Sequence, residues 1–219
     1  MKRKIWLAAA VTVAVVVALA VWLVRAGPAA NGDEVAWFVR QHATLWGKIA
    51  ALAQYDVVKT SEPMACSNGT ATYVCLLSKT DVAPIVDALR RYGVEVNVTE
   101  VDAAWVLVAA YNFTSGEVQW RNVTATKAWR LQWGGEAVVV YQTPQLKRSL
   151  GEMLRIESEV GRRLSALKGV TSVGIAGDKI IVTVENGASG DLVERIIKEV
   201  KSVDPEVEVE VVYAKAALA

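Results

Sequence analysis

The sequence predicts a mixed α+β protein: an N-terminal transmembrane helix, two ferredoxin-like lobes and an intervening β-rich, Trp-rich segment. Three observations lead to this prediction. An unbroken apolar run covers residues 5–24. Two stretches with the order helix–strand–strand–helix–strand follow one another at an offset of about 110–115 residues, so that residues 94–98 (VEVNV) match residues 207–211 (VEVEV). Between them, residues 104–134 are rich in tryptophan and in β-forming residues.

The apolar run predicts a signal-anchor over residues 5–25. Twenty helical residues measure about 30 Å, the thickness of a bilayer hydrocarbon core, and Trp6 and Trp22 lie near its two ends. Residues 1–4 carry three basic side chains, so the positive-inside rule places them in the cytoplasm and the chain beyond the linker at residues 26–32 outside. A cleaved signal peptide is the alternative because alanines follow the run, although its apolar region usually has only about 7–15 residues.

Four of the six asparagines begin Asn-x-Thr motifs: Asn68, Asn97, Asn112 and Asn122. None of these motifs has proline at its middle position. We expect N-glycosylation in an extracytoplasmic compartment, which agrees with the predicted topology. The alternative is that asparagine and threonine simply occur together in polar strands and turns.

The only two cysteines, Cys66 and Cys75, flank the dipeptide Asn68-Gly69. Asn-Gly between short extended stretches is typical of a β-hairpin, so the two thiols should face each other across its strands. Outside the cytoplasm such a pair is expected to form a disulfide. A metal site is not expected, because His42 is the only histidine and no further soft ligand lies nearby.

The first lobe is predicted over residues 33–103. Asp33 should cap a helix that runs to about residue 54, with Phe38, Leu45 and Ile49 on its apolar stripe. A strand at residues 72–77, a helix at residues 80–93 and an alternating strand at residues 94–98 follow. This lobe lacks an obvious first strand, and we expect it to borrow one from residues 105–111.

The second lobe is predicted over residues 135–219. A strand at residues 136–142 precedes a helix that starts at Thr143-Pro144. Strands at residues 170–175 and 179–185, a helix capped by Ser189 and a strand at residues 207–211 complete a β-α-β-β-α-β order. This lobe should fold by itself around an apolar core made of Leu150, Leu154, Leu164, Ile180, Val182, Ile196, Val200, Val207 and Val209.

The insert at residues 104–134 supplies the candidate ligand or partner surface, namely Trp105, Trp120, Trp129 and Trp133. Exposed aromatic rings stack on sugars and are favoured at binding interfaces. The structural interpretation is that these rings fill the space between the lobes. Because Trp120 and Trp129 have opposite parity along an extended chain, a turn or bulge is expected near residues 122–127.

Composition and motifs limit the chemistry. Without the four basic residues at positions 2–4 and 25, the chain carries 20 basic and 23 acidic residues and no basic patch, which argues against nucleic-acid binding. No nucleophile elbow, zinc-protease helix, phosphate loop or cysteine–histidine pair is present. The sequence therefore predicts no catalytic residue, no cofactor and no metal.

These features predict a non-enzymatic structural or interaction protein of a cell-envelope assembly, held in the cell membrane by residues 5–25. Its partners would be the lipid bilayer and another protein or a second copy of itself. An inward-anchored helix, a long helix and ferredoxin-like lobes broadly resemble the outer-face scaffold subunits of pilus and secretion platforms, which implies an assembly role. The alternative is a membrane-tethered protein that binds a carbohydrate or small ligand in the inter-lobe cleft. A deep Trp-lined pocket would favour ligand binding, whereas buried tryptophans and an exposed apolar helix stripe would favour assembly.

Overall fold

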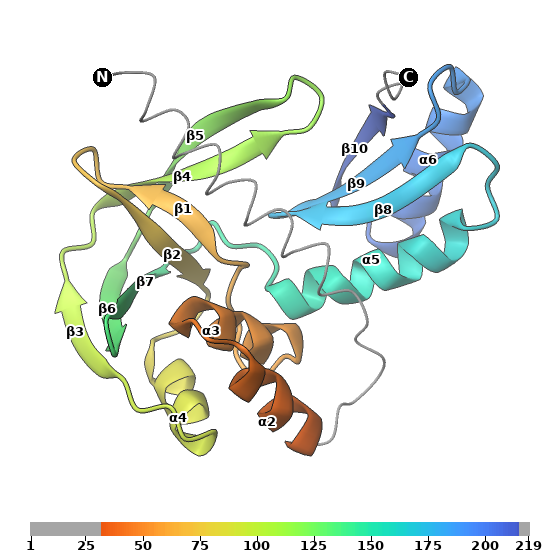
Figure 1. Ribbon diagram of the computed structural model, residues 1–219. Coiled ribbons are helices and arrows are strands. Elements are labelled where there is room, and N and C mark those ends of the chain that lie inside the picture. The colour runs from red at the N-terminus through yellow and green to blue at the C-terminus, as the bar shows by residue number, and fades with distance from the viewer. Residues whose placement is uncertain (1–31, 215–219) are drawn as a thin grey trace, which may run out of the picture.

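The structure is a computed structural model that describes residues 32–214. In this part of the chain the helices are α2 (Gly32–Gln41), α3 (Leu45–Gln54), α4 (Ala83–Arg91), α5 (Leu150–Leu164) and α6 (Gly190–Val203) (Figure 1). The strands are β1 (Met64–Ser67), β2 (Thr72–Ser78), β3 (Asn97–Val101), β4 (Trp105–Asn112), β5 (Glu117–Thr124), β6 (Lys127–Trp133), β7 (Glu136–Gln142), β8 (Val170–Ala176), β9 (Lys179–Val184) and β10 (Glu208–Tyr213). The fold is therefore mixed α+β, as the sequence predicts.

Seven strands form one sheet in the order β3-β6-β7-β2-β1-β4-β5. Its connections require the sheet to curl, because only Ala125 and Thr126 join the edge strand β5 to β6 near the opposite edge. In a flat sheet five strand spacings of about 4.8 Å would separate these strands by roughly 24 Å. The three Cα–Cα steps from Thr124 to Lys127 reach at most about 11 Å. The turn between β5 and β6 confirms the turn or bulge that was expected near residues 122–127.

Two hydrophobic cores lie on the two sides of this sheet. The outer face of β2, β6 and β7 packs against α2, α3 and α4, and Leu76, Leu131 and Val140 are buried there. The inner, concave face holds a second cluster that includes Val106 and Val108 of β4. Since side chains alternate between the faces of a strand, β4 directs Trp105, Leu107, Ala109 and Tyr111 to the outer face. In Figure 1 the three helices lie below the sheet, and the β4–β5 hairpin lies at the top, away from them.

The predicted β1–β2 hairpin and its disulfide, Cys66–Cys75, are both confirmed. Cys66 lies opposite Tyr73 and Cys75 lies opposite Met64, so both sulfurs are on the inner face, with the Cα atoms 5.8 Å apart. Asn68 closes the turn because its Oδ1 accepts the backbone N–H groups of residues 70 and 71 at 3.1 and 3.0 Å. The bridge thus joins two strands that the backbone already pairs.

The helix expected over residues 33–54 is divided into α2 and α3. Thr44 caps α3, and its Oγ1 accepts the backbone N–H of Gly47 at 3.2 Å. A Cβ at position 47 would lie 2.8 Å from that oxygen, so glycine is needed for this close approach. Lys48 then ties the two helices together, since its Nζ donates to the carbonyl oxygen of Val39 at 2.9 Å.

The remaining elements form a C-terminal unit: α5, β8, β9, α6 and β10. β9 lies in the middle of a three-stranded sheet, antiparallel to β8 and parallel to β10. Ile196 and Val200 of α6 and Leu164 of α5 are buried against this sheet, as expected. Leu150 and Leu154, which were expected in the same core, contact the large-sheet core instead. The helix begins later than Thr143-Pro144, because Ser149 forms a capping box with Glu152.

The prediction of two ferredoxin-like lobes is wrong in one central respect, because the strand expected to open the second lobe belongs to the large sheet. β7 pairs antiparallel with β6 and parallel with β2. The physical reason is the two-residue connection Gly134-Gly135, in which Gly134 has a φ of 57°. So short a turn forces β6 and β7 into a hairpin. The C-terminal unit is therefore αββαβ without a first strand, and β4, from the predicted insert, extends the large sheet beyond β1.

The signal-anchor at residues 5–25, the cytoplasmic residues 1–4 and the linker at residues 26–32 fall outside the described residues, except for Gly32. Among residues 32–214 no helix is both long enough and apolar enough to cross a membrane.

Candidate functional site

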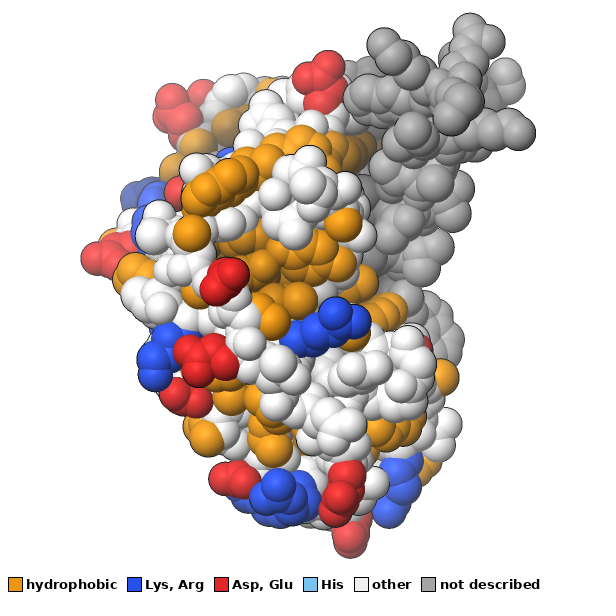
Figure 2. Space-filling model, turned by 90° about the vertical axis from the view of Figure 1, so that its left-hand side faces the viewer, with side chains coloured by type: hydrophobic (Ala, Val, Ile, Leu, Met, Phe, Trp, Pro, Cys, Tyr) orange, Lys and Arg blue, Asp and Glu red, His pale blue; other side chains and the backbone are white. Residues whose placement is uncertain are grey.

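Four of the eight exposed large hydrophobic side chains among the described residues lie together on the outer face of β4 and β5. Their register places Trp105 opposite Thr124, Ala109 opposite Trp120, and Tyr111 opposite Val118. We call the apolar residues of this side the β4–β5 outer face, which consists of Trp105, Leu107, Ala109, Tyr111, Val118 and Trp120. Trp105 is 50% exposed, Trp120 45%, Val118 41% and Tyr111 39%. Figure 2 shows a band of hydrophobic side chains across the upper half of the molecule, in which β4 and β5 lie.

The fold explains why this face is uncovered. α2, α3 and α4 pack on β2, β6 and β7, and no described helix has its main contacts with β4 or β5. The tip of the hairpin is held in place from another direction, because the backbone N–H and the Oγ1 of Thr114 donate to Glu210 Oε1 of β10 at 2.9 and 2.8 Å. The tip of the β4–β5 hairpin is therefore attached to β10 of the C-terminal unit.

The other two candidate tryptophans are separate from this surface. Trp129 is buried in the core beneath the helices. Trp133 packs against the same core, and its ring lies 5.0 Å from the Nζ of Lys48. Lys48 is itself only 6% exposed, and burial lowers the pKa of its ammonium while Glu136 opposes this effect. Trp129 and Trp133 therefore serve the packing of α2 and α3 on the sheet.

The four predicted glycosylation sites all lie in or beside the large sheet. Asn68 is in the β1–β2 turn, Asn97 begins β3, and Asn112 ends β4. Asn122 lies on β5 opposite Leu107, on the same side as the β4–β5 outer face. Asn112 is half-buried and its Oδ1 accepts the N–H groups of the next turn, whereas the other three side chains are exposed.

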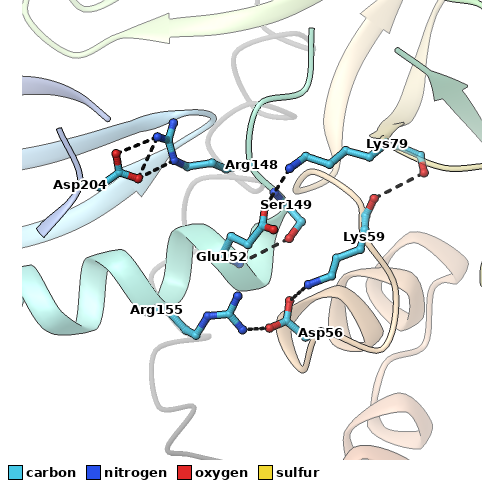
Figure 3. A network of polar contacts seen from close by, with 9 residues as sticks. Asp56, Lys59, Lys79, Arg148, Ser149, Glu152, Arg155 and Asp204 are labelled. Carbon is cyan, nitrogen blue, oxygen red and sulfur yellow. Dashed lines mark hydrogen bonds and ion pairs between the residues drawn. The ribbon is translucent and has the colours of Figure 1, made fainter. Parts of the chain in front are cut away.

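A network of ion pairs joins the large-sheet part to the C-terminal unit (Figure 3). Asp56, just after α3, binds Lys59 at 2.8 Å and also Arg155 of α5. Lys79, after β2, reaches Glu152 of α5 at 3.2 Å. Local sequence patterns do not indicate this network, because Asp56 and Arg155 are 99 positions apart.

A close helix contact supports these ion pairs. A Cβ at Gly151 of α5 would lie 2.8 Å from the carbonyl oxygen of Ala53 and would also collide with Asp56. Glycine at this position therefore lets the first turn of α5 approach the end of α3. The backbone N–H of Leu150 donates to the carbonyl oxygen of Thr60 at 2.8 Å in the same region.

A pocket of about 380 Å³ opens beside the network and is lined by Lys79, Lys147, Arg148, Glu152, Arg155, Ile156, Asp204 and Glu206. Arg148 forms a two-point pair with Asp204, at 2.9 and 2.8 Å. Burial alone would raise the pKa of Glu152, but the N–H of Ser149 and the Lys79 ammonium outweigh it, so that the pKa lies below its usual value. The pKa of Asp204 is lowered in the same way, with the N–H of Glu206 and Arg148 opposing burial. Glu152 therefore holds α5 to the large-sheet part through Lys79, whereas Asp204 ties the end of α6 to the segment that precedes α5.

A second pocket, of about 560 Å³, lies in the C-terminal unit and is lined by Arg163, Ala166, Leu167, Lys168, Leu192, Arg195 and Glu199. Neither of these two pockets is lined by tryptophan. The Trp-lined inter-lobe cleft that would favour ligand binding is therefore not found at either of them.

Several titratable groups outside the ion-pair network have shifted pKa values. Burial raises the pKa of Glu62, Asp178 adds to the rise, and the N–H of Gly177, which donates to Glu62 Oε1 at 2.8 Å, opposes it. Burial also raises the pKa of Glu157 on α5. Burial and then Lys48 lower the pKa of His42. Within residues 32–214 no group of three His, Cys, Asp or Glu side chains is arranged to hold a metal ion.

Comparison of the chain with protein-family models, with curated proteins and with solved structures gives no match. The arrangement of the described residues is therefore the basis for the functional proposal.

Proposed function

We propose that the chain is a membrane-anchored, extracytoplasmic, N-glycosylated protein with a structural or interaction role in a cell-envelope assembly, and that it contacts its partner through the β4–β5 outer face. The observation that supports this role best is the grouping of Trp105, Tyr111, Val118 and Trp120, all more than a third exposed, on one rigid strand pair. Contiguous exposed apolar surface in a folded protein marks an interaction site, and tryptophan and tyrosine are enriched at such sites.

The β4–β5 outer face lies at the end of the molecule opposite α2, the helix that follows the proposed membrane anchor. α2, which follows the linker at residues 26–32, lies at the bottom of Figure 1, whereas the β4–β5 hairpin lies at the top. Seven linker residues span at most about 25 Å, while a compact domain of this size is roughly 40 Å across. With residues 5–25 in the bilayer, the outer face of the hairpin is held at the end of the molecule away from the membrane.

A second candidate function is carbohydrate binding, which the two exposed rings of Trp105 and Trp120 favour because sugars stack on open aromatic faces. Such binding would use the open sheet face, since the pocket between the large-sheet part and the C-terminal unit is lined mostly by charged side chains. Trp120→Ala should abolish retention on immobilised polysaccharides if this function is correct.

Topology and glycosylation test the leading proposal together. Intact cells that produce the full chain are treated with an external protease, and the chain is analysed before and after removal of N-glycans. We expect the part beyond residue 32 to be degraded, and we expect each Asn→Gln change at an occupied motif to reduce the mass by one glycan. Complete protection of the C-terminal unit in intact cells, with degradation after lysis, would contradict the proposed location.

A further inference from the structure

β5 is an edge strand with properties that favour pairing with another strand. It is eight residues long, pairs only with β4 within the described chain, and follows a regular register without a bulge. Every side chain of β5 except that of Val123 is exposed. Long, regular and exposed edges are templates for strand addition, and proteins usually block them with bulges, prolines or short length.

The other strand edges of the molecule differ from β5. β3, at the opposite edge of the large sheet, has five residues. In the small sheet β8 has a register irregularity between Val170 and Ser172, and β10 has six residues. β5 is therefore the longest regular edge among the described strands.

The sequence of β5 identifies a matching partner. Residues 117–121 read Glu-Val-Gln-Trp-Arg, which is complementary to itself when two copies run antiparallel about Gln119. In that register Glu117 of each copy lies opposite Arg121 of the other, and Val118 lies opposite Trp120. Within residues 32–214 neither Glu117 nor Arg121 has an ion-pair partner of its own.

We propose that β5 pairs with β5 of a second copy of this chain about a two-fold axis at Gln119, so that the two large sheets join into one. This inference rests on the proposed assembly function and names a second copy as the partner at the free edge of the same hairpin, beside the β4–β5 outer face. Two-fold pairing of identical strands closes on itself, because each edge is used once. Opposite charges placed directly across two strands stabilise such a pair, and like charges destabilise it.

The proposed pairing also accommodates the predicted glycan. The residue opposite Asn122 would be Gly116 of the second copy, so a sugar on Asn122 would have no side chain directly opposite it. The apolar residues of the two copies would form one continuous face, with both Trp120 rings near the axis. The contact between Thr114 and Glu210 fixes the hairpin tip before pairing, which reduces the loss of conformational entropy on association.

Cysteine crosslinking of the full chain in native membranes tests this register. Because Cys66 and Cys75 form a disulfide, an introduced cysteine supplies the only free thiol among residues 32–214. Gln119→Cys should yield a disulfide-linked dimer on mild oxidation with copper phenanthroline, since position 119 faces itself. The matched control is Ser115→Cys on the same hairpin, whose two copies would be about 27 Å apart at about 3.4 Å per residue, and it should remain monomeric.

Charge reversal provides an independent test by sedimentation of the detergent-solubilised chain. Glu117→Arg or Arg121→Glu places two pairs of like charges across the axis and should weaken dimerisation on the order of ten-fold. The double variant exchanges the charges and should restore the dimer. At concentrations low enough for every variant to be monomeric, the thermal unfolding temperature should stay unchanged, since both side chains are exposed.

The outcomes separate this inference from the proposed function. A Gln119→Cys dimer together with rescue by the double charge reversal supports the pairing. A wild-type monomer and absence of the Gln119→Cys dimer overturn it. If a photo-crosslinker at Trp120 then captures a different protein, the assembly function stands without self-pairing. If position 120 captures nothing, the proposed function fails as well.

Discussion

Reduction of the Cys66–Cys75 bridge should lower the free energy of unfolding by an amount that its short loop determines. The two cysteines are nine positions apart, and closing a loop of that length restricts the unfolded chain by about 2.6 kcal/mol. Both residues are fully buried in the inner core, and reduction leaves their side chains in place. The backbone pairing of β1 with β2 and with β4 also remains. We therefore expect reduction to cost about 2.6 kcal/mol without loss of the fold.

The assay is thermal unfolding of the chain with and without a phosphine reductant, followed by circular dichroism. For a protein of this size each kcal/mol shifts the midpoint by about 2–4 °C, so reduction should lower it by roughly 5–10 °C. Cys66→Ser with Cys75→Ser should cost more than reduction, because two hydroxyls are placed in an apolar site. A shift under about 2 °C, or loss of the cooperative transition, would refute the reasoning that the bridge acts only on the unfolded chain.

Three further predictions concern α5 and the C-terminal unit. Gly151→Ala should destabilise the protein, because a Cβ at this position would collide with the end of α3. Gly161→Ala on the same helix has no neighbour within 4 Å and should stabilise the protein by about 0.5–1 kcal/mol. Urea unfolding measures both changes in stability, and equal effects of the two variants would contradict the close contact at Gly151. Burial raises the pKa of Glu157 above its ordinary 4.5. Glu157 therefore contributes its full share of the folding free energy below that pH, where its carboxyl is protonated, and this contribution is lost as the pH rises through the higher pKa of the folded state. Glu157→Gln should therefore raise the unfolding temperature at pH 7, with the gain vanishing at acidic pH; a gain that persists at pH 3 would contradict this cause. Residues 143–214 should unfold cooperatively as a separate fragment, and addition of residues 135–142 should not stabilise it, because β7 pairs only in the large sheet. Calorimetry compares the unfolding temperatures of the two fragments, and a higher value for residues 135–214 would contradict this prediction.

Local patterns identified most of the secondary structure. The alternating valines at residues 207–211, the cap at Ser189 and the Asn68-Gly69 hairpin each predicted an element that the structure contains, whereas the strand expected at residues 94–98 lies later, as β3. These signals depend on residues a few positions apart, for which capping and side-chain alternation are decisive. The break at Thr44 was missed because the apolar stripe continues through it, and only the approach of Gly47 to the Thr44 side chain shows why the helix stops.

The arrangement of strands depended on contacts that local patterns do not contain. Residues 136–142 form a nearly continuous apolar stretch that would fit either sheet, and only the Gly134-Gly135 turn assigns them to the large sheet. The sequence pattern presents the candidate tryptophans as one group, whereas the helices cover Trp129 and leave Trp105 and Trp120 exposed. The charged network between Asp56, Arg155 and their neighbours joins residues too far apart in sequence to be recognised as a cluster.

The central claim is that the β4–β5 outer face is the surface through which this protein joins an assembly. Site-specific photo-crosslinking in intact cells tests it most directly, with benzoylphenylalanine placed at position 120 and, as the matched control, at position 37. Trp37 is 53% exposed and Trp120 is 45% exposed, so the two sites are equally accessible, but Trp37 lies on α2, away from the hairpin. We predict a discrete crosslinked protein adduct from position 120 and none from position 37. Adducts of equal yield from both positions, or none from position 120, would contradict the account.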